Sequence, residues 1–293
     1  MCYNILMERI IYSATRASSK HPERNEDSFF VAENGSVGVF DGLGGRAGSE
    51  AASAEANRVC SEHLGSVSMD ERMWPIDAQH LMHEALTSAN SSIRELGVIG
   101  IATTAMIGQV YRTPKGQQFA QFAYSGDSRA YVLRRSRFIS ISLDHAASMR
   151  GIPEEEAREI QDLIDKVERK DQLGSSRRLF WHWNQRNVIE HCLDGNDNPF
   201  ISFNNVVVQP GDTIALTTDG IHDNLTGSEI KAILGVYADR DAAQKLVDRA
   251  YARSQTTQIV PPTISAQGGA VEYIRRKPDD MTAIVRPVWL SID

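Results

Sequence analysis

Acidic residues stand beside apolar runs at five places along the chain. In chain order they are Glu26 and Asp27 before 28–33, Asp41 after 37–40, Asp127 between 119–126 and 129–135, Asp219 and Asp223 after 212–218, and Asp279 and Asp280 before 281–288. A single Asp near a glycine is most often a turn residue, because its side chain hydrogen-bonds the local backbone. Carboxylates gathered in one place repel each other unless protons or cations compensate them. Since such oxygen ligands suit Mg²⁺, Mn²⁺ or Ca²⁺, the repeated pattern favours a hard divalent metal over zinc.

The stretch VGVFDGLGGRAGSEAAS (37–53) permits a second interpretation. Residues 42–47 fit the G-x-G-x-x-G/A spacing of a dinucleotide site between a strand and a helix. A bound pyrophosphate would be repelled there by Asp41, and no clear strand ends in an acid about 20 residues downstream to hold a ribose. A glycine after Asp41 also lets the Gly42 carbonyl approach a metal, because no Cβ intervenes. We therefore prefer the metal interpretation.

Composition limits the class of protein. The 293 residues are 41% hydrophobic, which is enough for a large core, and we find no domain linker. A net charge of −7 argues against binding to nucleic acid or to an anionic membrane. The cysteines Cys2, Cys60 and Cys192 are scattered, which indicates reduced thiols. With no membrane-length apolar run and no signal-peptide pattern, we expect a cytoplasmic protein.

The apolar patterns predict the elements that position the acids. Strands are predicted at 28–33, 37–40, 103–111, 119–126, 129–135, 205–209, 212–218 and 281–288, and helices at 47–64, 76–96, 153–173, after the capping box Thr226–Glu229, and near 241–253. We expect 119–135 to form a hairpin, and 174–187 and 254–278 to be less ordered. Adjacent strands with helices grouped apart indicate an α+β fold of antiparallel sheets covered by helices.

The ordered motifs resemble a known family. NEDSFF, VFDGLGG, SGDSRAY, LDHA, TTDGIHDNL and KPDDMTAIV are similar to motifs of the metal-dependent protein phosphatases of the type 2C family, particularly its bacterial branch, from about residue 12 to 288. The resemblance implies a four-layer α-β-β-α sandwich of two antiparallel sheets in a single domain over 1–293, with a long flap region at about 146–187. It also implies direct hydrolysis of phosphoserine or phosphothreonine by a water or hydroxide that bridges two Mn²⁺ or Mg²⁺ ions.

The resemblance further implies a role for each acid. Asp41 would bridge both metals, Asp219 and Asp279 would hold the first, Glu26 and the Gly42 carbonyl would support the second, and Asp127 and Asp223 would belong to a third, weaker site. Asp27 would be a catalytic residue that orients a metal-bound water. Asp280 stands where many members of the family have Asn, a departure without a clear consequence at this level.

Two other positions depart from the family pattern. Pro22 stands where the family usually has a phosphate-binding Arg, and Leu43 stands where many eukaryotic members have a His. Arg24, Lys20 or Arg16 could supply the missing positive charge, and we prefer Arg24 as the catalytic residue that binds phosphate. Both departures predict lower turnover without loss of the metal centre.

Three aromatic features are predicted to be structural. We expect a hydrogen-bonding role for His145, an exposed turn position for His222, and a packed anchor for the segment Trp181–Trp183. Helix 153–173 is expected to be a solvated helix rather than a recognition element.

The resemblance implies a phosphorylated protein as substrate, a signalling role opposing a Ser/Thr kinase, and a monomer that binds neither nucleic acid nor membrane. The alternative is a catalytically weak or inactive relative that binds a phosphoprotein or a kinase and regulates it, and Pro22 keeps this alternative open. A nucleotide-dependent oxidoreductase is the least favoured function.

Overall fold

The computed structural model describes residues 10–43, 48–67, 72–174, 176–238, 240–256, 259–260 and 271–288. Residues 44–47, which complete the dinucleotide-like glycine pattern, lie outside the described residues, and so does Cys2. The other two cysteines, Cys60 and Cys192, are free thiols. No helix in these described ranges combines the length and the apolar character needed to cross a membrane.

Two antiparallel sheets form the centre of the molecule. One has the strand order β1 (Tyr12–Arg16), β13 (Met281–Pro287), β10 (Thr213–Thr217), β7 (Arg129–Arg134) and β8 (Arg137–Ser140). The other has the order β2 (Asp27–Val31), β3 (Val37–Leu43), β5 (Ala105–Arg112), β6 (Gln118–Ser125) and β9 (Ser202–Val207), with β4 (Ala102–Thr103) paired to the end of β3. A separate pair joins β11 (Ile259–Val260) to β12 (Val271–Glu272).

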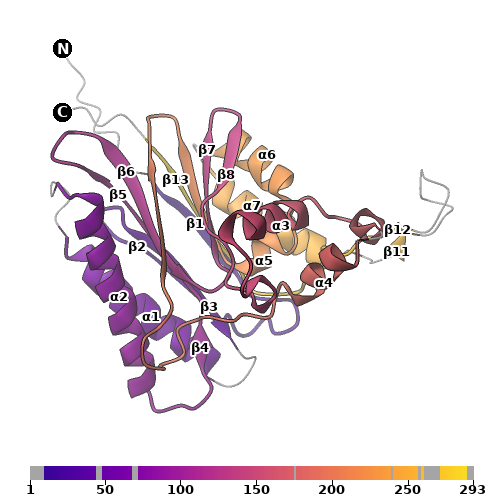
Figure 1. Cartoon of the computed structure of the whole chain (residues 1–293), viewed down its shortest axis with the longest axis horizontal. Helices are drawn as coiled ribbons and strands as arrows, with labels where there is room; N and C mark the ends of the chain where they lie inside the picture. Colours follow the sequence, from indigo (N-terminus) through magenta and orange to yellow (C-terminus); the bar gives the residue numbers. More distant parts are fainter. Residues whose placement is uncertain are drawn as a thin grey trace.

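Helices cover both sheets and confirm the expected four layers. Helices α1 (Ser49–Gly65) and α2 (Pro75–Glu95) pack on the sheet of β2 and β3, whereas α6 (Gly227–Tyr237) and α7 (Ala242–Ser254) pack on the sheet of β13 and β7 (Figure 1). Five short segments lie in the connections: η1 (Ala147–Met149), α3 (Glu154–Ile164), η2 (Lys170–Leu173), α4 (Arg177–Gln185) and α5 (Asp219–His222).

Successive side chains of a strand point to opposite faces of the sheet, so each strand contributes to two layers of the core. On β3, Val39 faces the opposite sheet and Phe40 faces α1 and α2, and both are fully buried. On β13, Ile284 faces the opposite sheet and Val285 packs toward α6 and α7. Because both faces of these strands are buried, they are nearly continuous apolar runs in the sequence.

The predicted hairpin over 119–135 is wrong. Strands β6 and β7 lie in different sheets, so the turn between them crosses from one layer of the sandwich to the other. Gly126 makes this crossing with a φ of 111°, and a Cβ at this position would lie 2.7 Å from Thr104. Two alternating runs around a tight turn are compatible with a hairpin and with a sheet-to-sheet corner, and only pairing with distant strands decides between them.

The predicted helix at 153–173 is shorter in the structure. Helix α3 ends at Ile164, because the Asp165 carboxylate pairs with Arg129 and Arg275 binds the carbonyls of Ile164 and Val167. Conversely, the described part of 174–187, residues 176–187, is more ordered than predicted. They contain α4, whose first turn is capped by the Ser176 hydroxyl, which accepts the Leu179 N–H at 3.2 Å.

Candidate metal centre

Antiparallel pairing brings the acids to one end of the sandwich. Asp27 at the start of β2 is the direct cross-strand partner of Asp41 near the end of β3. Asp219 follows the end of β10, and Asp279 precedes the start of the neighbouring β13. In an antiparallel sheet the end of one strand lies beside the start of the next, so acids at such ends become neighbours. We call the following residues the acidic cluster: Glu26, Asp27, Asp41, Asp127, Asp219, Asp223 and Asp279.

Two glycines permit the close approach of backbone segments in this cluster. A Cβ at Gly220 would lie 1.9 Å from the Asp280 carbonyl oxygen, so only glycine lets α5 lie against the start of β13. A Cβ at Gly42 would lie 2.5 Å from the Ser49 carbonyl oxygen and 2.8 Å from that of Glu26. Gly42, the first glycine after Asp41, is therefore required by the packing at this end of the sheet.

Burial, and after it the repulsion between carboxylates, raises the pKa of two acids of the cluster. Partial burial, and after it the charges of Asp219, Asp27, Asp279 and Asp127, raise the pKa of Asp41 well above its usual range. The same two causes raise the pKa of Asp127, again with burial as the larger one. A buried group of carboxylates that repel each other in this way is costly to keep without a cation, and such arrangements are typical of functional sites.

Unsatisfied oxygen atoms show that the residues fit a divalent metal. Asp27, Asp127 and Asp219 each bury an Oδ1 atom that accepts no hydrogen bond within the described residues. Buried carboxylate oxygens are normally hydrogen-bonded, so these atoms are available as ligands. No three His, Cys, Asp or Glu side chains in the described part of the chain already converge as a metal cage. A lysine ammonium lies among the carboxylates instead.

That ammonium belongs to Lys277. Its Nζ hydrogen-bonds Asp219 Oδ2, lies 2.7 Å from Asp279 Oδ2 and lies 3.4 Å from Asp223 Oδ2. For Asp219, burial raises the pKa to about 6 even though Lys277 acts to lower it. For Asp223, burial also raises the pKa, but the charges of Arg186, at 3.1 Å, and of Lys277 outweigh burial and hold the pKa below its usual range.

Two further acids are oriented by hydrogen bonds. The Thr218 hydroxyl donates to Asp27 Oδ2 at 2.8 Å. Asp280 accepts the backbone N–H of Ser18 at 2.7 Å on one oxygen and that of Glu26 at 2.6 Å on the other. An Asn at position 280 would offer only one acceptor oxygen, so the acid found here has a structural consequence: it holds the loop that carries Glu26.

Arg24 lies beside the cluster. Its Nη2 is 2.9 Å from Glu26 Oε1, and its Nε is 3.6 Å from Glu50. Arg16 instead stacks on the Tyr251 ring at 3.4 Å, and Lys20 is exposed. Of the three cations considered for phosphate binding, Arg24 is therefore the one that contacts a member of the acidic cluster.

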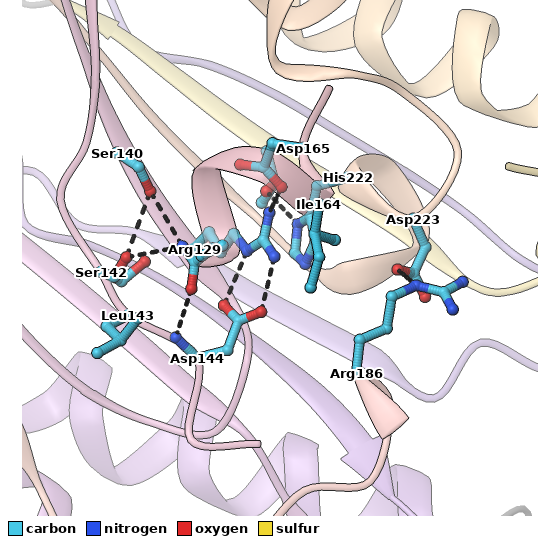
Figure 2. Close-up of polar contacts among 12 residues, drawn as sticks. Arg129, Ser140, Ser142, Leu143, Asp144, Ile164, Asp165, Arg186, His222 and Asp223 are labelled. Atoms are coloured by element: carbon cyan, nitrogen blue, oxygen red, sulfur yellow. Dashed lines mark hydrogen bonds and ion pairs between the residues drawn. The ribbon is translucent and has the colours of Figure 1, made fainter. Parts of the chain in front are cut away.

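The motif SGDSRAY contains a residue that our sequence analysis missed. Arg129 is buried and donates to both Asp144 oxygens, at 2.8 and 2.6 Å, and to Asp165 at 2.8 Å (Figure 2). We call Arg129, Asp144 and Asp165 the Arg129 network. It ties the turn after Asp127 to the LDHA motif and to the end of α3. An Arg two residues after the motif's Asp is the only signal in the sequence.

Arg275 and Lys277 were also missed. Arg275 is 1% exposed and donates to the carbonyls of Ile164 and Val167, at and after the end of α3, and of His222 and Leu225, at and after the end of α5. It thereby fixes the flap region against the segment that carries Asp219 and Asp223. The run RRKPDD indicates that cations adjoin the acids, but it does not indicate which of them points inward.

The three aromatic predictions have different outcomes. His145 is buried, accepts the Gly126 N–H on Nδ1 at 3.1 Å and contacts Ser202 through Nε2 at 2.9 Å, a structural arrangement as expected. His222 was expected to be exposed, but it is 4% exposed because α5 packs against β13. Trp183 is buried beneath Arg186, whereas Trp181 is 50% exposed, so the anchor consists of one tryptophan.

Comparisons with known proteins agree with the family resemblance of the motifs. No protein-family model matches the chain. A probable protein phosphatase 2C 55 of Arabidopsis thaliana is 27% identical over 282 residues, which are 92% of this chain and 50% of that protein. The chain therefore spans about half the length of this curated relative.

Solved structures match almost the whole chain. The serine/threonine phosphatase PstP/Ppp of Mycobacterium tuberculosis superposes with a TM-score of 0.68 at 20% identity, covering 96% of this chain and 99% of that one. A PstP catalytic domain in complex with two manganese ions gives a TM-score of 0.65 at 19% identity, covering 96% and 98%. The chain has the fold of the metal-dependent serine/threonine phosphatases, as the motifs implied.

Proposed function

We propose that this protein is a Mn²⁺- or Mg²⁺-dependent phosphatase that hydrolyses phosphoserine and phosphothreonine in proteins. One observation carries the proposal: the acidic cluster at one end of a phosphatase fold, in which buried oxygens of Asp27, Asp127 and Asp219 accept no hydrogen bond from the part of the chain that the structure describes. The curated relative and the manganese-containing PstP structure support it.

We assign the proposed metal ions to residues of the acidic cluster and to the Gly42 carbonyl. Asp41 would be shared by two ions, Asp219 and Asp279 would hold the first, Glu26 and the Gly42 carbonyl would support the second, and Asp127 and Asp223 would hold a third. When bound, such ions supply an activated water nucleophile and neutralise the phosphoryl oxygens. Asp27, oriented by Thr218, would accept a hydrogen bond from the attacking water. Arg24 would bind the phosphoryl group from its position beside Glu26.

The proposal includes a single domain, a monomeric cytoplasmic protein and a phosphoprotein substrate formed by an opposing Ser/Thr kinase. The net charge of −7 supports a protein partner over nucleic acid. The two described cysteines are free, which supports a reducing compartment.

The test is hydrolysis of p-nitrophenyl phosphate and of a phosphoserine peptide with MnCl₂, followed by excess EDTA. We expect manganese-dependent turnover that EDTA abolishes, and a loss of at least about a hundredfold in Asp219→Asn, because a metal ligand is removed. Asp162→Asn, at an exposed position of α3, is the matched control and should retain activity. Folded protein that hydrolyses neither substrate with any divalent metal would contradict the proposal and favour the regulatory alternative.

A further inference from the structure

The acidic cluster contains its own cation. The Lys277 ammonium contacts three members, Asp219, Asp223 and Asp279, from a side chain that is 28% exposed. Two of these acids, Asp219 and Asp279, are those assigned above to one ion, and Asp223 is assigned to another. The ammonium therefore lies where the ligand sets of two proposed ions meet.

The backbone of Lys277 is held in place for this contact. The Asn224 side chain accepts the Lys277 N–H at 2.9 Å and donates to the Lys277 carbonyl at 2.8 Å. The same amide nitrogen donates to the Gly220 carbonyl at 2.8 Å, so one side chain joins Lys277 to the segment that carries Asp219. Pro278 follows Lys277 and restricts its backbone to extended conformations. The lysine is thus presented to the carboxylates by a fixed backbone.

The Lys277 ammonium and a divalent ion would compete for the same carboxylate oxygen atoms. The Asp219 and Asp279 oxygens that bind Nζ cannot at the same time be metal ligands on the same lone pairs. A divalent ion that binds there must either lie beside the positive ammonium of Lys277 or displace that ammonium, which the flexible lysine side chain allows. Without metal, the same ammonium offsets the repulsion between the acids.

We propose that Lys277 is an intramolecular cation that competes with the divalent metal for Asp219, Asp223 and Asp279. The ammonium stabilises the metal-free cluster and weakens metal binding. The protein therefore binds the divalent metal only at a higher metal concentration than the same carboxylates would need without Lys277. The inference rests on the proposed metal centre. It adds a residue of this chain that sets metal affinity.

The first experiment measures Mn²⁺ binding by isothermal titration calorimetry and thermal unfolding in EDTA, for wild type and Lys277→Met. Methionine keeps an unbranched side chain of similar length and removes the charge. We expect the dissociation constant for Mn²⁺ to fall by about fivefold or more, the usual lower range for coupling between two ligands. We expect the unfolding temperature in EDTA to fall, because the acids then repel each other without compensation. The control is Lys170→Met, which removes an ammonium 2.9 Å from Glu272. This variant should not change the dissociation constant for Mn²⁺, nor the difference between the unfolding temperatures measured with Mn²⁺ and in EDTA.

A second experiment uses the wild-type chain alone, so it does not depend on the folding of a variant. Amine acetylation followed by mass spectrometry measures how accessible each lysine is, with and without Mn²⁺. We expect saturating Mn²⁺ to increase acetylation of Lys277 severalfold and to leave that of Lys170 unchanged.

The outcomes separate this inference from the proposed function. If wild type binds Mn²⁺ but Lys277→Met binds it with the same affinity, and metal leaves the acetylation of Lys277 unchanged, competition is wrong while the metal centre stands. If neither protein binds Mn²⁺ under conditions in which both are folded, the metal centre and the competition are both wrong.

Discussion

Two charged groups lie close together inside this molecule and differ in how their charges are balanced. In the Arg129 network, one guanidinium makes three hydrogen bonds to two acids, and its geometry toward Asp144 is bidentate. In the acidic cluster, carboxylates from five segments repel each other, and several of their oxygens accept no hydrogen bond in the described structure. The two groups are coupled, because the charge of Asp144 adds to the rise in the pKa of Asp127.

The comparison separates a structural from a functional use of buried charge. A buried ion pair with satisfied hydrogen bonds fixes the positions of the segments that it joins, and breaking it leaves an uncompensated charge. A buried group with excess negative charge costs stability unless something binds it, so its persistence points to a ligand. The Arg129 network joins the elements around the acidic cluster, and the acidic cluster is the site that we propose for the metals. Two variants test this difference, one in the acidic cluster and one in the Arg129 network.

The largest effect is expected for Asp41→Asn, which removes the acid placed between the two proposed ions. Hydrolysis of p-nitrophenyl phosphate with Mn²⁺ should fall by at least about a hundredfold. The unfolding temperature of the metal-free protein should stay the same or rise, because one source of repulsion is gone. Retained activity would show that Asp41 is not a metal ligand, and a large loss of stability would show that the cluster is structural.

The opposite pattern is expected for Arg129→Met. Removing the cation leaves the buried Asp144 and the partly buried Asp165 without this partner, so the free energy of unfolding should fall by about 3 to 5 kcal/mol in urea denaturation. The control is Arg94→Met, which breaks an exposed ion pair to Asp197 and should cost about 1 kcal/mol or less. Equal, small effects of both variants would contradict a structural role for the Arg129 network.

A smaller effect is expected from pH through His145. Burial, with a contribution from His191, lowers the pKa of His145 to about 4, and the groups that face it are Tyr124, His191, Phe200 and the Ser202 hydroxyl. Between about pH 6.5 and pH 4 the unfolded chain binds a proton here that the folded chain does not, so stability falls as the pH falls, by up to about 3 kcal/mol.

The measurement for His145 is a comparison of wild type with His145→Gln in urea denaturation at pH 7 and pH 4.5. The raised pKa of Asp219 changes stability with pH in the opposite direction, since there the folded chain binds the extra proton. The difference between the two proteins isolates the histidine. If both lose the same stability between these two pH values, His145 does not carry the effect.

Local patterns in the sequence were sufficient for most elements. Apolar runs, alternating or continuous, predicted β2, β3, β5, β6, β7, β9, β10 and β13 to within a few residues, and the capping box at Thr226 begins α6 as expected. The sequence also placed the acids beside strand ends, because the apolar runs show where strands stop. These features depend on neighbouring residues, which the sequence displays directly.

Only the tertiary structure decided which distant segments pair or pack against each other. The run 119–135 has the local pattern of a hairpin, yet β6 pairs with β5 and β9 while β7 pairs with β8 and β10. His222 has the local context of a turn, yet the packing of α5 buries it. Lys277 is one of three cations in a row, and the hydrogen bonds from Asn224 to its backbone, which help to place it beside the acids, join residues 53 positions apart.

The sequence by itself therefore determined the apolar strands, the acids at their ends and the family resemblance that these acids carry. The tertiary structure decided which strands share a sheet and which cation each buried acid contacts. The physical reason is that strand pairing and ion pairing join residues far apart in the chain, and their energies depend on burial and geometry that exist only once the layers have packed.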